Sequence, residues 1–420
     1  MKRSVVIVGG GIAGLGAAYE LVRRSGTGVT LLESKPRFGG RIHTLRHGKW
    51  PIELGAEFIH GRNSTLFKLI RSAKLHTRVA PESQFFFEAG RLKRINLWDR
   101  IGEVIERIDL KKPDCSFAEF LAAERLNENI RRLARGFAEG FDAAYVDRIS
   151  AHSMLRAQQA SDQMDGEWQG RITQGYSALI RFLERKSHAA GARLISNAKV
   201  THISWKAGSV EVTWHQGGAR RTTKADAVIA TLPLGVLKAR TITFKPHLRS
   251  KQAAIDELGF GNVMKVIMVF RSRWWPKTRT GIIQALDEPL PTWWSDSRGP
   301  LLTGWAGGPK ADALRLLSHQ HIEALSLEVV SRVFSASAAL LRKQFVTMHC
   351  YRWDHDPDVL GAYSYIPKNG LKLPPELAAP IAETLFFAGE ATVSDAQTGT
   401  VFGAHESGIR VANEILHQSG

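Results

Sequence analysis

The chain has 420 residues, of which 44% are hydrophobic and 23% are charged. This balance is ordinary for a folded globular protein, and it excludes a disordered chain, a collagen-like chain and a protein with many membrane spans. The 57 Lys and Arg residues outnumber the 40 Asp and Glu residues by 17. Such a charge can attract nucleic acid or an anionic membrane, or it can serve solubility. No tail, arm or amphipathic segment concentrates it, so we expect no specific nucleic-acid partner.

Cysteine content and the two ends of the chain suggest a compartment. Cys115 and Cys350 lie far apart and form no CxxC pair, so we expect no disulfide framework and no metal site. Residues 1–8 imitate the start of a signal peptide, but a run of glycines interrupts them. Residues 415–420 are too few and too polar for a tail anchor. We therefore expect a cytoplasmic protein without a membrane anchor.

The first elements in chain order form a βαβ unit. Residues 5–8 are an apolar run that ends in glycines, as in a strand buried on both faces. Apolar residues then recur at helical spacing over 12–22, and residues 29–32 read as a second strand that ends at Glu33.

Beyond residue 63 the composition changes to stretches rich in Arg, Glu and Ala. Strand-like segments occur again after residue 190. No internal repeat or heptad array is present. We expect helices over 117–126, 127–141, 175–187, 322–334 and 401–416, and strands over 192–195, 200–205, 210–214, 227–230, 263–270 and 384–388.

Residues 9–14 carry the pattern GxGxxG between the first strand and the first helix. Gly9 permits a tight turn, Gly11 lets a pyrophosphate approach the backbone, and Gly14 allows close packing of helix on strand. The helix N-terminus supplies free N–H groups for phosphate. Glu33 follows Gly14 by 19 positions, where a carboxylate can accept from ribose hydroxyls. The alternative is a glycine-rich turn without a ligand, but strand, helix and acid in register favour a dinucleotide site.

Four further segments identify the dinucleotide by resemblance. The segments ESKPRFGGR (33–41), ELGAEFIHG (53–61), LFFAGE (385–390) and GTVFGA (399–404) resemble motifs of the flavin amine oxidase superfamily, in the family's order. The resemblance implies a two-domain α/β fold of the p-hydroxybenzoate hydroxylase type, with a Rossmann-like FAD domain and a substrate domain of mixed sheet and helices. We expect the FAD domain to comprise residues 1–62, 171–240 and 380–420, and the substrate domain residues 63–170 and 241–379.

The resemblance also implies noncovalent FAD and a set of residues around it. Ala362 stands where covalent members carry a flavin-linked cysteine. Arg41 would neutralise pyrophosphate charge, Val200 would contact adenine through its backbone, and Glu390 would face the ribityl chain. The full expected set is Gly9, Gly11, Ile12, Ala13, Gly14, Glu33, Arg41, Gly55, Ala56, Glu57, Val200, Gly389, Glu390, Thr400 and Val401.

Lys265 stands inside the apolar run VMKVIMVF. From the residues alone, the simpler interpretation is an edge position from which the ammonium reaches water, because a buried lysine is costly. The resemblance favours a different role, since family members carry a lysine on such a strand that holds a water near flavin N5. Desolvation would bring such a lysine toward a useful pKa.

The segment from Trp353 to Tyr365 resembles the family's re-face segment. Trp353 and Tyr363 would shape the approach of an amine, with Tyr363 as one wall of the family's aromatic sandwich. The opposite wall would be Thr400. In having a threonine at this position, the chain is similar to polyamine oxidases and lysine-specific histone demethylases. His60 matches a histidine in the substrate tunnel of some polyamine oxidases, and its alternative is a hydrogen-bonded loop histidine.

Phe58 occupies the position of the arginine that binds the substrate carboxylate in amino-acid oxidases of the superfamily, which argues against an amino-acid substrate. A polyamine would require carboxylates in the tunnel. Glu57, Glu139, Asp142 and Asp147 are the candidates, and we expect them to lie on ordinary solvated surfaces instead.

The resemblance thus implies oxidation of an amine, with hydride transfer to flavin N5, an imine that hydrolyses to a carbonyl compound, and hydrogen peroxide formed from oxygen. Two alternatives remain at this point. One is a desaturase or protoporphyrinogen oxidase on the same fold, and the other is a flavin-bearing protein that binds a partner without turnover.

Overall fold

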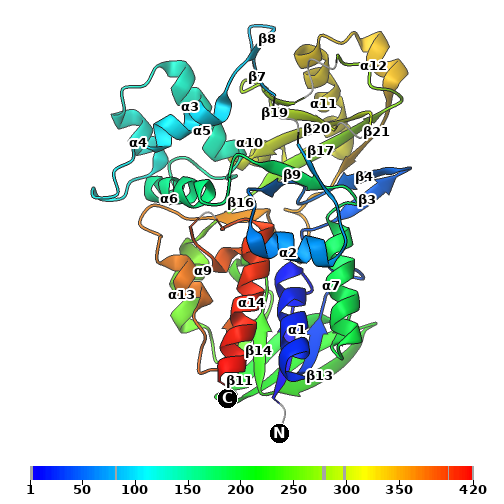
Figure 1. The fold of residues 1–420 in the computed structure, drawn as a ribbon, viewed down its shortest axis with the longest axis vertical. Coiled ribbons are helices and arrows are strands. Elements are labelled where there is room, and N and C mark those ends of the chain that lie inside the picture. Colours follow the sequence, from blue (N-terminus) through cyan, green and yellow to red (C-terminus); the bar gives the residue numbers. More distant parts are fainter. Residues whose placement is uncertain (1–2, 81–82, 277–280, 297–298, 396, 419–420) are drawn as a thin grey trace.

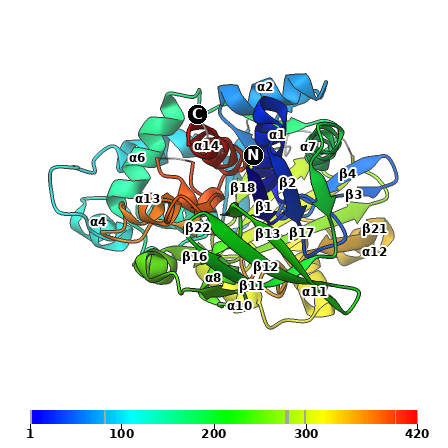
Figure 2. The ribbon, with the colours of Figure 1, turned by 90° about the horizontal axis from the view of Figure 1, so that it is seen from below.

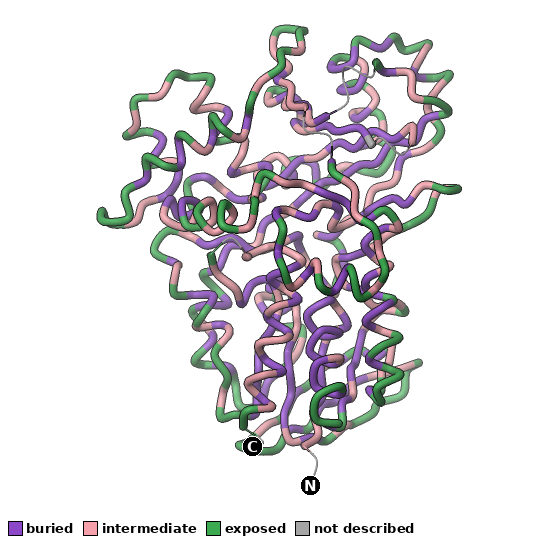
Figure 3. The backbone as a smooth tube through the Cα atoms, viewed as in Figure 1, coloured by how far each residue is buried: buried purple, intermediate pink, exposed green. Residues whose placement is uncertain are grey.

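The computed structural model describes residues 3–80, 83–276, 281–296, 299–395 and 397–418. Figure 1 shows two layered parts, one above the other, with both termini at the lower end. Buried residues run through the middle of each part and across their junction, whereas exposed residues gather at the outer loops (Figure 3). Among the described residues, no helix is long and apolar enough to cross a bilayer.

A five-stranded parallel sheet forms the centre of the lower part. Its strands lie in the order β10 (Arg193–Ile195), β2 (Gly28–Leu32), β1 (Ser4–Val8), β14 (Ala227–Ala230) and β23 (Leu385–Phe387). Val6 in the middle strand pairs with Thr30 on one side and with Val228 on the other. Because both faces of this sheet are covered, β1 and β14 are apolar at nearly every position.

Helices cover one face of the parallel sheet, and a second sheet covers the other (Figure 2). The helices are α1 (Ile12–Ser25), α7 (Ser177–Ala189) and α14 (Val401–His417), and the second sheet has the order β13 (Ala219–Ala225), β12 (Ser209–Gln216), β11 (Lys199–Lys206) and β15 (Thr243–Lys245). Val5 and Ile7 pack in the core on the helical side, whereas Val6 and Val8 pack in the core under the second sheet. The alternation follows from the two-residue period of a strand.

A seven-stranded sheet forms the upper part. Its order is β21 (Phe345–Cys350), β17 (Val263–Phe270), β20 (Leu301–Gly307), β19 (Thr292–Asp296), β18 (Ile282–Gln284), β7 (Gln84–Glu88) and β8 (Arg91–Arg94). Even-numbered residues of β17 from Met264 to Phe270 pack in a core with α11 (His319–Phe334). Ile267 and Val269 point to the opposite face and contact Ile52 and Leu54. That face of β17 therefore turns toward the lower part.

The remaining elements connect or flank these sheets. Helices α3 (Leu97–Ile105), α4 (Phe117–Ala123), α5 (Glu128–Gly140) and α6 (Ala151–Asp162) share a separate apolar core beside the seven-stranded sheet. The others are β3 (Thr44–His47), β4 (Trp50–Glu53), β5 (Ile59–His60), α2 (Ser64–Ser72), β6 (Thr77–Val79), β9 (Gln169–Ile172), α8 (Leu234–Lys238), η1 (Arg249–Lys251), α9 (Gln252–Glu257), β16 (Gly259–Gly261), α10 (Gly308–Leu314), α12 (Ala338–Gln344), β22 (Tyr363–Tyr365), α13 (Leu373–Ala378) and η3 (Glu390–Thr392).

The helices and strands expected from the sequence are present, with ends that differ by a few residues. Many other elements escaped prediction, among them α3, α6, β20 and β21, and two cases show the reason. The hairpin of β7 and β8 interrupts the region that reads as helical, and β13 is a strand of mostly exposed polar residues. β13 forms because its backbone pairs with β12 along seven positions, which a hydrophobic pattern cannot reveal.

The strands of the parallel sheet all come from the three segments expected to form the FAD domain. Leu373 and Leu377 of α13, and Ala254 and Ile255 of α9, nevertheless pack in the core beneath β1 and β14. Both helices belong to the segments assigned to the other domain, so the exact boundaries stay a prediction.

Candidate active site

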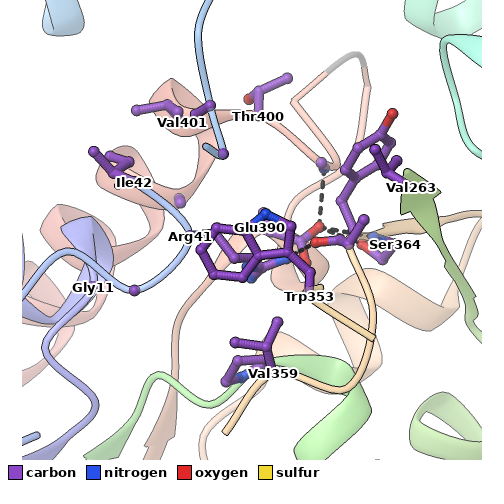
Figure 4. A pocket seen from close by; sticks show the side chains of 18 of the residues that line it. Gly11, Arg41, Ile42, Val263, Trp353, Val359, Ser364, Glu390, Thr400 and Val401 are labelled. Atoms are coloured by element: carbon purple, nitrogen blue, oxygen red, sulfur yellow. Dashed lines mark hydrogen bonds and ion pairs between the residues drawn. The ribbon is translucent and has the colours of Figure 1, made fainter. Parts of the chain in front are cut away.

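A cavity of about 420 Å³ lies at the junction of the two parts and is lined by residues from both. It gathers every residue that the sequence assigns to cofactor or catalysis except Gly14. In Figure 4, Arg41, Glu390 and Trp353 lie together in the middle of this pocket, with Gly11 on one side and Val263 on the other.

One end of the cavity is formed by the turn between β1 and α1. Gly9 has a φ of +111°, a left-handed region that favours glycine, and a Cβ on Gly14 would lie 2.0 Å from the Gly9 carbonyl oxygen. Gly14 therefore serves helix packing, as expected, and does not line the cavity. A Cβ on Gly11 would meet nothing within 4 Å, so the backbone there faces open space. The first N–H groups of α1 lack intrahelical acceptors, and the Gly11 cap provides no side chain. This end suits a pyrophosphate.

Glu33 lies beside this turn and is 5% exposed. It accepts hydrogen bonds from the backbone N–H groups of Gly10 at 2.7 Å and Lys35 at 2.9 Å. Burial raises the pKa of Glu33, and these hydrogen bonds act in the opposite direction. Val200 lines the same end of the cavity. Glu33 is thus placed to accept hydrogen bonds from a ribose, and Val200 is placed to contact an adenine.

Arg41 and Glu390 occupy the middle of the cavity. Arg41 Nη1 lies 2.8 Å from Glu390 Oε1 and donates to the Ala362 carbonyl at 2.7 Å. Glu390 Oε2 accepts from the Ser364 hydroxyl at 2.6 Å and from the Gly399 N–H at 3.1 Å. One guanidinium and one carboxylate are thus held in fixed positions at the junction of the two parts.

The N-terminus of α14 also faces the cavity, and α14 packs against α1 on the same face of the parallel sheet. Thr400 is its N-cap, and the threonine hydroxyl accepts from the Gly403 N–H and donates to the Gln397 carbonyl. The hydroxyl is therefore occupied by the helix end, and Thr400 and Val401 present small side chains to the cavity. With two helix N-termini, Glu33 and Arg41 along one continuous space, the residues fit FAD.

Lys265 is buried at 2% exposure in β17, between β20 and β21. The interpretation of an edge lysine that reaches water is therefore wrong, because a paired strand lies on each side. Its Nζ lies 2.7 Å from Glu57 Oε2 and donates to the Gly55 carbonyl at 3.1 Å.

The expectation that Glu57 lies on a solvated surface is also wrong. Glu57 is 9% exposed, and besides Lys265 it pairs with Arg171 Nε at 2.7 Å and accepts from Trp294 Nε1 at 3.1 Å. Gly55 and Ala56 of the same connection line the cavity beside it. The carboxylate of Glu57 is thus committed to protein groups, which leaves the backbone of this connection for cofactor contact.

An aromatic wall extends from Lys265 toward α5. Ring contacts link Trp305 to Trp294, Trp294 to Phe58, Phe58 to His60, and His60 to Phe141. Burial lowers the pKa of His60 to about 4, so its ring is neutral near pH 7. His60 contacts two aromatic rings and lines the cavity, which fits the tunnel position better than a loop histidine.

Tyr363 and Trp353 are fixed on the other side of the cavity. The Tyr363 hydroxyl donates to the Phe141 carbonyl at 2.6 Å, and burial raises its pKa. Trp353 donates from Nε1 to the Leu54 carbonyl at 3.0 Å. These bonds hold the two rings at fixed angles to the cavity.

Asp142 follows Phe141 directly and lines the cavity. Within the described ranges, no hydrogen bond or ion pair reaches its carboxylate, and desolvation raises the pKa of Asp142 to about 7. The expectation of a solvated position is wrong for Asp142. Asp147 is exposed, as expected, and Glu139 is half-buried outside the cavity lining.

The sequence analysis gave no role to several residues of the site, among them Arg171, Trp294 and Ser364. Arg171 and Trp294 reach the site through tertiary pairing of strands distant in sequence, whereas Ser364 lies within the segment from Trp353 to Tyr365 that the resemblance marks. The available signal for Arg171 was its place in the short strand QGRI, because charged residues in short strands are rarely buried without a partner.

Comparison with known proteins agrees with this geometry. A family model described as flavin containing amine oxidoreductase matches residues 12–416. Polyamine oxidase 4 of Oryza sativa subsp. japonica is 30% identical over 467 residues, covering 99% of this chain and 90% of the relative. Lysine-specific histone demethylase 1 homolog 2 of Arabidopsis thaliana is 29% identical and also covers 99% of this chain, which spans 58% of that longer protein.

Among solved structures, wild-type putrescine oxidase bound to putrescine superimposes with a TM-score of 0.83 over 99% of each chain, at 20% sequence identity. This likeness shows the two-domain fold. The family model also matches nearly the whole chain. The shared fold and the family match together support one assignment. The chain belongs to the flavin-containing amine oxidoreductase family and is an FAD-dependent enzyme that oxidises amines.

Proposed function

We propose that the enzyme oxidises an aliphatic amine that carries a second cationic group, such as a diamine or polyamine, and that oxygen is the electron acceptor. The observation that carries the substrate class is Asp142, a cavity carboxylate without an ion-pair partner among the described residues. A carboxylate in an apolar surrounding binds an ammonium group strongly, because the pair forms where water competes little.

The surroundings of Asp142 support a cationic aliphatic chain. The cavity near it is lined by Phe137, Phe141, Trp98 and Tyr363, whose faces attract cations and whose edges pack against methylene groups. His60 is neutral near pH 7 and adds no repulsion. The net charge of +17 would repel a polyamine at long range, so a carboxylate inside the cavity is what such a substrate requires.

The remaining residues take roles that follow from their positions. FAD, when bound, accepts a hydride at N5 from the carbon next to the amine nitrogen, which leaves an imine. Tyr363 and Thr400 would flank the reacting amine, one with a ring and the other with a small side chain that leaves room for a substituted nitrogen. Trp353 limits the approach from its side, and Lys265 would hold a water. Exclusion of bulk water by the aromatic wall keeps the reacting amine unprotonated.

Arg41, Glu33 and the N-terminus of α1 would bind the FAD phosphates and ribose without a covalent bond, since Ala362 offers no nucleophile. Ala362 is buried, and its carbonyl oxygen accepts a hydrogen bond from Arg41, so its side chain packs in the site.

The test is anaerobic mixing of the FAD-loaded enzyme with polyamines, diamines, monoamines and amino acids, followed by admission of oxygen. We expect bleaching of the flavin band by diamines or polyamines at lower concentrations than by monoamines of equal chain length. Oxygen should restore the band with one hydrogen peroxide per amine oxidised. Bleaching by monoamines alone would overturn the substrate class, and absence of bleaching across the panel would overturn the proposal.

A further inference from the structure

Two of the three N–H donors of Lys265 are already occupied by the protein. One points to Glu57 Oε2 at 2.7 Å and another to the Gly55 carbonyl at 3.1 Å. An ammonium group has three donors. One N–H therefore remains without a partner among the described residues, and Lys265 itself lines the cavity.

Glu57 is in turn held from its far side. Its Oε1 atom receives the Arg171 Nε donor at 2.7 Å and the Trp294 Nε1 donor at 3.1 Å, so its two oxygens serve different partners. Arg171 is 2% exposed, and its guanidinium also lies 4.3 Å from the centre of the Phe58 ring. The Glu57 carboxylate cannot rotate without breaking the hydrogen bonds from Arg171 and Trp294.

The charges of the groups around Glu57 explain why this carboxylate must be held in place. Lys265 and Arg171 are buried cations, and a buried charge without a partner is strongly destabilising. Glu57 lies between them and contacts both. The other nearby acid is Glu53, which accepts from the Thr44 hydroxyl and the Tyr176 N–H, and burial raises its pKa. Glu57 is thus the carboxylate in direct contact with Lys265, and Glu53 acts on it only at longer range.

We propose that Glu57, fixed by Arg171 and Trp294, is a positioning residue that holds the Lys265 side chain in place and directs its remaining N–H into the cavity. The inference rests on the proposed role of Lys265 in the reaction. It assigns to the side chain at position 57 a function distinct from cofactor contact.

The decisive variant is Glu57→Gln, which keeps the shape and an acceptor oxygen but removes the negative charge. Flavin reduction and reoxidation are measured separately, as functions of pH, in the native enzyme, Glu57→Gln, Lys265→Met and the double variant. Glu103→Gln on α3, an exposed position, makes the same change of charge away from the site. The visible absorption band of bound FAD is titrated with pH in each protein as a readout that needs no turnover.

We expect Glu57→Gln to slow the step that Lys265→Met slows, by about 10- to 100-fold. Its pH profile and its flavin spectrum should differ from those of the native enzyme, because the substitution removes the negative charge in direct contact with Lys265. That difference should vanish in the double variant, whose rates should equal those of Lys265→Met within about twofold.

Native rates and a native pH profile in Glu57→Gln, with Lys265→Met impaired, would overturn the positioning role and leave the proposed function intact. Native rates in Lys265→Met would instead remove the role of Lys265 and this inference with it. If Glu57→Gln does not fold, Trp294→Phe decides, because it removes only one donor to Glu57. It should change the same pH profile by a smaller amount, and an unchanged profile would overturn the inference.

Discussion

Arg41 and Glu390 meet in the middle of the cavity with 2.8 Å between Nη1 and Oε1, although 349 positions separate them in the chain. Arg41 follows the βαβ unit, and Glu390 follows the last strand of the parallel sheet. The pair therefore joins the first and last segments of the FAD-binding part. It also fixes the guanidinium where the resemblance requires a partner for pyrophosphate.

We expect Arg41→Ala to weaken FAD binding by about 10- to 100-fold, because hydrogen bonds to charged groups contribute about 1.5–3 kcal/mol each. Titration of the apoprotein with FAD, followed by quenching of flavin fluorescence, measures the change. Arg46→Ala is the control, since Arg46 is exposed on β3 and its loss changes the net charge equally. Equal affinities of the two variants would contradict the assigned role of Arg41.

The noncovalent binding of FAD leads to a second prediction. Ala362 lines the cavity and has no atom that could bond to flavin carbon. Acid precipitation of the FAD-loaded enzyme should leave all of the yellow colour in the supernatant and none in the protein pellet. A pellet that stays yellow after washing would show a covalent link and would contradict the prediction.

The local parts of the cofactor site could be predicted from the sequence. The glycines of residues 9–14 act through the backbone of one turn, and their spacing to Glu33 is set by one helix and one strand. Gly14 even takes the packing role that the pattern implies. Such features depend on neighbours in the chain, so a local pattern contains them.

The charges of the substrate side could not be predicted in the same way. Glu57 read as a surface acid because its partners, Arg171 and Trp294, are 114 and 237 positions away. Asp142 also read as a surface acid, because it directly follows an amphipathic helix and its C-cap, and the exposed face of that helix is charged. Only the packing of α5 against the aromatic wall reveals that its carboxylate faces a cavity.

His405 supplies a prediction about acid stability. It lies in α14, is 5% exposed, and burial lowers its pKa from 6.5 to about 4. Above pH 6.5 the ring is neutral in both the folded and the unfolded chain. As the pH falls from 6.5 toward 4, the unfolded chain binds a proton that the folded chain does not, and stability falls by about 1.4 kcal/mol per pH unit.

We therefore expect His405→Leu to lose less thermal stability than the native protein between about pH 7 and about pH 5. His43 and His60 also have pKa values lowered to about 4, so some acid sensitivity should remain. His188→Leu, at an exposed position of α7, is the matched control and should behave like the native protein. The same loss on acidification in His405→Leu as in the control would contradict the prediction. Melting temperatures at the two pH values provide the measurement.

Asp142 gives the sharpest test of substrate class. Its pKa is raised to about 7 by desolvation, so the carboxyl group is neutral in acid and becomes an anion as the pH rises through 7. Only the anion pairs with a distal ammonium group. The preference for putrescine over butylamine, which differ only in the second amino group, should therefore grow with pH across this range. Because both amines carry the same reacting group, its own titration cancels in the ratio of their kcat/KM values.

We expect Asp142→Asn to lower kcat/KM for putrescine by about 10- to 100-fold while butylamine changes by less than about threefold. The ratio of the two should then no longer vary with pH. Asp147→Asn removes the same charge five positions along the chain, from an exposed side chain, and should leave both the ratio and its pH dependence native. If the ratio still rises through pH 7 in Asp142→Asn, the second cation binds elsewhere. If both amines lose activity equally, Asp142 supports the site without selecting a diamine.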